Sequence, residues 1–435
     1  MTDDGKPPRT LAEINHRFVG RALATGKVAA NALRLASRRV LSRDDVGVYA
    51  AIGENLAREL DGMKGMAMKV GQILSYLEGA LPPETHAALE VLQKGATPVA
   101  FSSLVPVIES ALGAPIEALF ESIDPIAIAA ASIGQVHRAR FAGADVAVKI
   151  QYPDVRATFE SDLSRLDRLA GLASIATAVD GRALVEELRA RILEECDYVR
   201  EAKSQRAFAS RLAGDPEIAI PEVFSERSAQ TVLTSRFVEG LDFQRFCASS
   251  GAERKNAVAI TLVRASHHCF FALGAINADP HPGNYVFPAD GRVVFLDFGC
   301  VRRFEPGYVE RDRHLARVVC DGDRARFREA LLATGIVARP SRFDFDRHWE
   351  LLRHQYRPYI EPSFRFTPAY LQALVDYGRP NEPNLRLLAI PPEWIWQQRL
   401  VSGLHAILTR LDAEGPFRET FRAALEAPLV PLELR

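Results

Sequence analysis

Cysteine is scarce in this sequence, and its spacing excludes two kinds of stabilising site. The 435 residues include five well-separated cysteines with no CxxC pair: Cys196, Cys247, Cys269, Cys300 and Cys320. An odd number without paired spacing indicates neither a disulfide framework nor a zinc site. We therefore expect reduced thiols and a cytoplasmic protein.

Long apolar runs are also missing. No apolar stretch reaches the roughly 18 residues of a candidate membrane helix. The start, MTDDGKPPRT, lacks the basic and then apolar order of a signal peptide. We therefore expect no transmembrane helix and no export.

Neither sign of charge is in excess. The net charge is -1, and 25% of the residues are charged. Such a chain has no general attraction to nucleic acid, so no nucleic-acid partner is expected. The length predicts more than one domain.

The N-terminal residues 1–45 form a basic arm with a helical apolar pattern. Between Ile14 and Ser42 the chain carries arginine and lysine but no acid. The basic face either packs, solvated, on the body of the protein or contacts an anionic membrane surface. The second possibility predicts a peripheral location at the membrane.

A long helix follows in which three glycines lie in the interior: Gly62, Gly65 and Gly71. Each costs about 1 kcal/mol relative to alanine. Gly62, Gly65, Lys69 and Gln72 share one face of this helix, next to its apolar stripe. A cost of this kind predicts that another part of the molecule approaches this helix closely.

Further helices are predicted over Phe101–Phe120 and Ala183–Ala202, with strands between them. Residues 126–150 predict two strands joined by a turn at Ala142 and Gly143. The remainder of the chain is predicted to be mostly helical, apart from a compact non-helical segment at 279–299.

That segment, DPHPGNYVFPADGRVVFLDFG, contains three groups suited to magnesium and phosphate. Asp279 and Asn284 are separated by a turn rich in proline and glycine, and Asp297 follows the apolar VVFL. Mg²⁺ prefers oxygen ligands, so Asn284 and Asp297 are predicted metal ligands and Asp279 a catalytic residue. This Asp, Asn and DFG layout is the catalytic half of the protein-kinase signature.

A phosphate-covering loop and a strand lysine would complete that signature. The segment AAASIGQV keeps two positions of G-x-G-x-x-G-x-V, and VAVKI follows it. On its own, the lysine of VAVKI could be an edge-strand solubiliser; after this loop, it is better interpreted as a phosphate ligand. The predicted nucleotide-binding residues are Ala129, Ala130, Ala131, Ser132, Gly134, Val136 and Lys149.

Lys149 requires a carboxylate to orient it. Glu195 lies on an apolar stripe of the predicted 183–202 helix, where an unpaired carboxylate would be costly. Glu187 lies on another face of that helix. Either residue satisfies the requirement, and the sequence leaves the choice open.

Three features distinguish the chain from ordinary protein kinases. The loop is rich in alanine, K-V-G-Q occupies 69–72, and E-C-D occupies 195–197. Together these resemble the UbiB/AarF/ADCK family over Asp61–Gly299. The resemblance implies an α+β, two-lobed protein-kinase-like fold with an N-terminal helical extension (KxGQ) packed over the active site. Its implied parts are the arm 1–45, the extension 46–125, an N-lobe 126–240 and a C-lobe 241–435.

The resemblance also implies an activity and its partners. Lys69 would meet the carboxylates of the ExD motif, which makes Lys69 and Glu195 catalytic candidates beside Lys149 and Asp279. The implied cofactors are ATP or ADP and Mg²⁺, and Ala129 and Ala131 of the alanine-rich loop imply a preference toward ADP. ATP hydrolysis or small-molecule phosphoryl transfer would support ubiquinone or related isoprenoid-lipid metabolism. A lipid or quinone-precursor ligand and lipid-biosynthesis enzymes are the implied partners.

Two other functions are compatible with these motifs. One is a nucleotide-binding pseudokinase scaffold with little turnover. The other is a small-molecule kinase of the aminoglycoside phosphotransferase type, which also carries a D-x-H-x-x-N loop but lacks the KxGQ helix and the alanine-rich loop.

Overall fold

The computed structural model describes most of the chain after residue 98. The described ranges are 99–131, 133–161, 163–164, 186, 189–190, 192–377, 383–384, 387–389 and 391–434. The predicted arm, the KxGQ helix with Lys69, and Glu187 lie outside them. The chain divides into two compact units, Met1–Ala202 with Val223–Phe237 and Lys203–Glu222 with Val238–Arg435.

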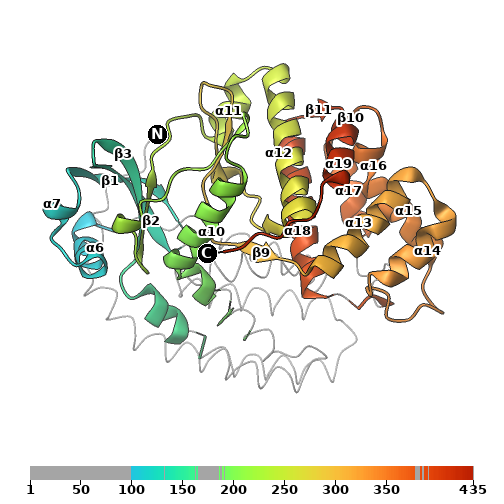
Figure 1. The fold of residues 1–435 in the computed structure, drawn as a ribbon, viewed down its shortest axis with the longest axis horizontal. Helices are drawn as coiled ribbons and strands as arrows, with labels where there is room; N and C mark the ends of the chain where they lie inside the picture. The colour runs from blue at the N-terminus through green and yellow to red at the C-terminus, as the bar shows by residue number, and fades with distance from the viewer. Residues whose placement is uncertain are drawn as a thin grey trace, which may run out of the picture. The chain divides into compact units, whose positions relative to one another are not determined.

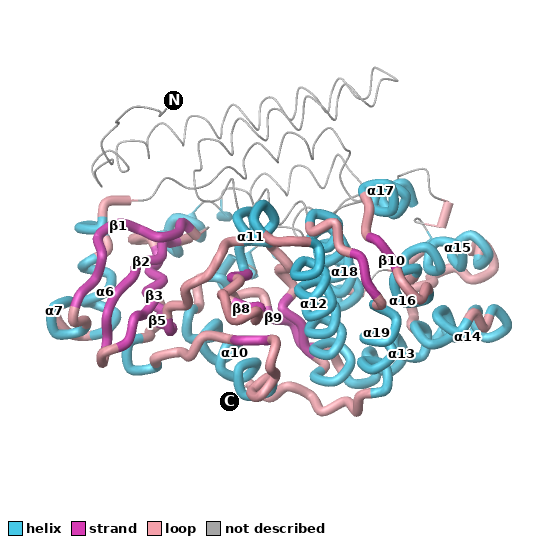
Figure 2. Tube along the Cα trace, turned by 90° about the horizontal axis from the view of Figure 1, so that it is seen from above, coloured by secondary structure: helices cyan, strands magenta, loops and turns pink. Residues whose placement is uncertain are grey.

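The first unit contains a four-stranded antiparallel sheet in the order β1-β2-β3-β5 (Figures 1 and 2). Its strands are β1 (Ser122–Ala130), β2 (Gly134–Phe141), β3 (Ala144–Gln151) and β5 (Val232–Arg236), and η3 (Ser225–Arg227) precedes the last. The predicted turn between β2 and β3 is confirmed. Ala142 and Gly143 have φ of 50° and 74°, as a two-residue hairpin turn requires.

The prediction of two strands between 126 and 150 was wrong, because this range contains part of a third. β1 begins at Ser122 and includes Pro125. Its pairing with β2 shifts register twice between Ile123 and Ala129. Such irregularities break the alternation of side chains by which a strand is recognised in a sequence.

One face of the sheet is buried against short helices. The helical segment predicted over Phe101–Phe120 is divided into η2 (Phe101–Ser103), α6 (Val105–Leu112) and α7 (Ile116–Leu119). Gly113, at φ 75°, ends α6 in the left-handed conformation. Val146, Val148 and Ile150 of β3 are fully buried in the resulting core. Side chains alternate along a strand, so Lys149 belongs to the opposite face.

The helix predicted over Ala183–Ala202 does not continue to residue 202. Residues 192–195 are helical, a turn follows, and α10 (Tyr198–Arg211) begins anew. Asp197 explains the restart, because its Oδ1 accepts the backbone N–H of Arg200 at 2.9 Å. A carboxylate in this position caps the first turn of a helix. The boundary between the two units falls within α10, after Ala202.

The second unit is mostly helical, as predicted, and α12 is at the centre of its core (Figure 1). Its helices are α11 (Phe243–Ser249), α12 (Ala252–Leu273), α13 (Pro306–Asp321), α14 (Arg324–Ala333), α15 (Phe345–Gln355), α16 (Arg357–Ile360), α17 (Pro368–Tyr377), α18 (Pro392–Arg410) and α19 (Phe417–Glu426). Within the described ranges, no helix has the length and apolarity needed to span a bilayer.

Short strands interrupt these helices and carry the non-helical segment. β4 (Ile218–Ala219), β8 (Val293–Phe295) and β7 (Tyr285–Val286) form one sheet, in that order. β6 (Ala275–Asn277) pairs with β9 (Val301–Arg303), and β10 (Phe364–Arg365) pairs with β11 (Glu414–Gly415). The 279–299 segment thus runs from β6, through η4 (Pro282–Asn284) and the β7–β8 hairpin, to β9.

Candidate functional site

Lys149 lies in the middle of β3, with Val136 of β2 and Leu233 of β5 as its neighbours in register. Its Nζ donates to Oε1 and Oε2 of Glu201 at 2.7 and 3.0 Å. The Lys149 side chain is 18% exposed and that of Glu201 only 4%. The edge-strand alternative is therefore wrong, because this lysine is on a central strand and is paired with a buried carboxylate.

Glu201 was not among the predicted carboxylates. The restart of α10 at Asp197 shifts the helical register, so the stripe through Glu195 does not continue into α10. Glu195 is half-buried at the end of the preceding helical turn. A sequence signal for Glu201 did exist: Asp197 is a suitable N-cap, and Tyr198 and Glu201 are then three residues apart on one helical face.

Tyr198 adds to the environment of the lysine. Its ring centroid is 5.0 Å from Nζ of Lys149, and the residue is buried. A cation close to an aromatic face is favoured further when water is excluded. The first unit thus holds a strand lysine between a carboxylate and a ring.

The alanine-rich segment includes the end of β1 and the start of its connection to β2. Ala129 and Ala130 pair with Val136 and Gln135, and Ala131 donates its backbone N–H to the carbonyl of Gly134 at 2.8 Å. Ser132 lies outside the described residues.

Gly134 is required where β2 meets β3. A Cβ at Gly134 would overlap the carbonyl oxygen of Ile150, which is backbone and cannot rotate away. The retained glycine of the motif therefore allows two backbones to approach closely.

The loop after β6 brings Asp279 and Asn284 together in the second unit. Nδ2 of Asn284 donates to the carbonyl of Asp279 at 2.9 Å and to its Oδ2 at 3.2 Å. The loop is tightened by His281, whose backbone N–H donates to the Asp279 carbonyl at 2.7 Å. Because its Nδ2 faces Asp279, Asn284 can direct its Oδ1 toward a cation.

Asp297 follows β8 and is joined to this loop by Asn277. The side chain of Asn277 donates to the Asp297 carbonyl and accepts the backbone N–H of Asp279 at 3.2 Å. Oδ1 of Asp297 accepts the backbone N–H of Gly299 at 2.8 Å. Asn277 was not predicted, and its position two residues before Asp279 is the only signal that the sequence offers for it.

The carboxylate of Asp297 and the amide oxygen of Asn284 are of the ligand type that suits Mg²⁺, since hard cations take oxygen ligands. Two of the three groups predicted for this site, Asp279 and Asn284, are in direct contact. The third, Asp297, is linked to them through one side chain.

A basic residue from far along the chain completes this part of the site. Arg399, on α18, donates from Nη2 to Oδ1 of Asp279 at 2.6 Å. It was not predicted, because 120 residues separate it from its partner.

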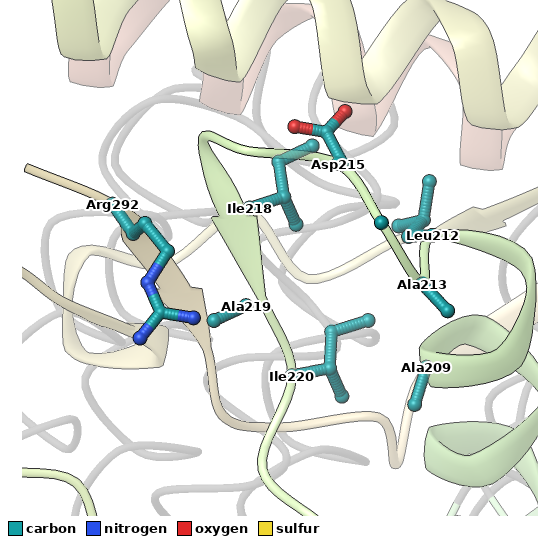
Figure 3. A pocket seen from close by; sticks show the side chains of 9 residues that line it. Ala209, Leu212, Ala213, Asp215, Ile218, Ala219, Ile220 and Arg292 are labelled. Carbon is teal, nitrogen blue, oxygen red and sulfur yellow. The ribbon is translucent and has the colours of Figure 1, made fainter.

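A pocket of about 340 Å³ also occurs in the second unit (Figure 3). Leu212, Ile218 and Ile220 line it, with Asp215 and Arg292 at its edges. Arg292 is paired with Asp290, and Asp215 with Arg264. Among the residues that the structure describes, none of the predicted site residues lines this pocket, so it is not the predicted nucleotide site.

Sequence comparisons identify the class of protein. The profile of the ABC1 atypical kinase-like domain matches residues 91–331. The mitochondrial atypical kinase COQ8 of Saccharomyces cerevisiae is 30% identical over 384 residues, which cover 85% of this chain and 75% of that protein. The mitochondrial atypical kinase COQ8B of Danio rerio is 31% identical over 386 residues, covering 85% and 60%. An uncharacterized chloroplastic aarF domain-containing protein kinase of Arabidopsis thaliana is 33% identical, covering 65% and 41%.

A solved structure shows the same fold. Rv3197 from Mycobacterium tuberculosis, determined as a complex with erythromycin, superposes with a TM-score of 0.66 at 29% identity and covers 83% of this chain and 91% of that chain. The fold is therefore kinase-like and α+β. The chain belongs to the UbiB/AarF/ADCK family of atypical kinase-like proteins.

Proposed function

We propose that this protein is an atypical kinase or ATPase that binds ATP or ADP together with Mg²⁺. The observation that supports this most directly is the side chain of Asn277. It joins Asp279 of the D-x-H-P-G-N motif to Asp297 of the DFG motif within one unit. The proposed catalytic aspartate and a proposed metal ligand are thus tied to one side chain, which supports the assignment of this part of the site.

Each residue has a role that follows from its surroundings. Lys149, oriented by Glu201, binds the α- and β-phosphates, and the β1–β2 connection covers them. Asn284 and Asp297 hold the metal ion. When bound, Mg²⁺ neutralises charge on the phosphates. Asp279 orients the attacking hydroxyl or water and accepts its proton, so rate enhancement comes from positioning and electrostatics.

The acceptor is proposed from the family. Relatives named COQ8 support a place in ubiquinone or related isoprenoid-lipid metabolism. A lipid or a quinone precursor is then the ligand beside the nucleotide, and lipid-biosynthesis enzymes are the protein partners. The basic arm 1–45 supports peripheral contact with an anionic membrane.

A thermal-shift titration tests the nucleotide site. We expect MgATP and MgADP to stabilise the wild type, by about 2.7 kcal/mol at 100 times Kd. Asp297→Asn should weaken or abolish this effect. Asp290→Asn is the matched control, because Asp290 is an exposed aspartate between β7 and β8 that pairs with Arg292. Absence of stabilisation at millimolar nucleotide would reject the proposal.

Turnover separates the remaining alternatives. Magnesium-dependent ATP hydrolysis that rises with lipid vesicles or a phenolic quinone precursor supports the enzyme. Nucleotide binding without turnover indicates a scaffold, and phosphorylation of an aminoglycoside in place of a lipid precursor indicates the phosphotransferase alternative.

A further inference from the structure

Arg399 forms a two-point contact with the loop that carries Asp279. Its Nη2 donates to Oδ1 of Asp279 at 2.6 Å, and its Nε donates to the carbonyl of Ala278 at 2.5 Å. The Arg399 side chain is 14% exposed and that of Asp279 is 37% exposed. Two donors on one edge of a guanidinium fix both the distance and the plane of the contact.

Helix α18 reaches this loop because it carries a glycine at the point of approach. Gly403 is one turn after Arg399, and a Cβ at Gly403 would overlap Cγ of Pro280, the residue after Asp279. The missing side chain therefore lets α18 pack directly on the loop.

The same helix is anchored to α13 by a second set of contacts. Nε2 of Gln397 donates to Oδ2 of Asp312 at 2.7 Å. Its Oε1 accepts the hydroxyl of Tyr308 at 2.7 Å. The part of α18 that carries Arg399 is thus held in place within the second unit. A side chain that positions another group needs such support.

The carboxylate of Asp279 is held at both oxygens. Arg399 donates to Oδ1, and Asn284 donates to Oδ2 at 3.2 Å. A carboxylate has about four lone-pair sites, so these two bonds orient it and leave capacity to accept a hydrogen bond from an acceptor hydroxyl or water.

We propose that Arg399 is a positioning residue, which aims the carboxylate of Asp279 at the attacking group. This inference rests on the proposed function of Asp279. It depends on the guanidinium fork, because a lysine ammonium cannot satisfy the carboxylate and the Ala278 carbonyl in one plane.

The test compares Arg399→Ala and Arg399→Lys with the wild type in full-length protein. Arg365→Ala is the matched control, since Arg365 makes an exposed pair with Asp412 through Nε and Nη2 at 2.9 and 2.6 Å. We expect Arg399→Ala to lower kcat for MgATP hydrolysis about 10- to 100-fold. Its Kd for MgATP should stay within about threefold, because Asn284, Asp297 and Lys149 remain. Arg399→Lys should be intermediate, and millimolar ethylguanidinium should restore part of the activity of Arg399→Ala.

The outcomes are distinguishable. Unchanged kcat in both Arg399 variants overturns the inference alone. A fall in kcat matched by weaker MgATP binding, with no ethylguanidinium rescue, shows a purely structural role and also overturns it. If the wild type binds nucleotide but does not hydrolyse it, the inference is rejected and the nucleotide site stands. If the wild type does not bind nucleotide, the proposed function is overturned and the inference with it. If Arg399→Ala does not fold, Arg399→Lys decides by the same kcat and Kd comparison.

Discussion

Nζ of Lys149 lies 2.7 Å from Oε1 of Glu201, a carboxylate 52 residues later in the chain. A central strand and a separate helix have to be assembled before the two charges meet. Glu201 is almost completely buried, so its charge loses hydration on folding. The attraction between the two charges offsets this desolvation cost.

Breaking this pair should destabilise the first unit. We expect Glu201→Gln to lower the free energy of unfolding by about 3 kcal/mol, measured by urea denaturation. Replacing both charges, with Lys149→Met and Glu201→Leu, should recover much of the loss while abolishing nucleotide stabilisation.

An exposed ion pair is the control for that experiment. Arg156 and Glu160 are 55% and 48% exposed and lie one helical turn apart. Arg156→Ala should change the free energy of unfolding by less than about 1 kcal/mol. If Glu201→Gln lowered the free energy of unfolding by no more than Arg156→Ala does, burial of the Lys149 pair would not be the cause of its contribution.

Gly134→Ala should disrupt the end of the β2–β3 pairing. The added Cβ overlaps the backbone carbonyl of Ile150, so the strands have to separate. We expect a loss of about 2 kcal/mol or more in thermal unfolding, together with weaker nucleotide binding.

A second glycine provides the contrast. Gly307, at the start of α13, has the flexible end of Arg311 near its would-be Cβ, and no other described residue within 4 Å. Gly307→Ala should be neutral or stabilising by up to about 1 kcal/mol, because alanine favours a helix. Similar destabilisation by both variants would show that close backbone approach is not the cause.

Asn277→Ala should uncouple the two acidic motifs. It removes the bonds to the Asp279 amide and to the Asp297 carbonyl, and leaving such groups unsatisfied costs about 1–3 kcal/mol. The thermal shift produced by MgATP should also fall. Asn256→Ala is the control, because Asn256 accepts a backbone N–H, that of Glu414, at an exposed site. Full retention of the MgATP shift in Asn277→Ala would refute the coupling.

Protonation of two histidines in the unfolded state should destabilise the second unit as the pH falls below about 6.5. Burial lowers the pKa of His405 to about 3 and that of His267 to about 4. Their unfolded pKa is about 6.5, so below this pH the unfolded state binds more protons than the folded one. The contribution of each neutral histidine to the free energy of unfolding is therefore fully present above pH 6.5. It is lost as the pH falls toward 4, by up to about 1.4 kcal/mol per pH unit for each histidine.

The contribution of His405 can be isolated. Its ring lies between the hydroxyls of Tyr359 and Tyr370, at 3.0 and 3.1 Å, and glutamine can supply one donor and one acceptor there. His405→Gln should reduce the slope of unfolding free energy against pH between 6 and 5. Asp312 opposes this trend between pH 6 and 4, because burial raises its pKa to about 6. Comparing wild type with His405→Gln cancels that contribution, and identical slopes would contradict the prediction.

Several features of this protein were predictable from local sequence because local chemistry dictates them. The Ala142–Gly143 turn, the position of Lys149 on a strand and the segment without an α-helix that contains Asp279, Asn284 and Asp297 all follow from spacing and turn residues. The family resemblance followed from the same short motifs, and the comparisons show it. The ligands and roles assigned to these residues stay predictions.

Tertiary structure decided which distant side chains meet these residues. Asp197 restarts a helix and so presents Glu201 to Lys149, while Gly403 lets α18 bring Arg399 to Asp279. Helical and strand patterns relate residues only a few positions apart, so neither Glu201 nor Arg399 could be assigned to its partner from such a pattern. A sequence specifies its local periods directly, but the pairing of charges across 52 or 120 residues depends on how whole elements pack.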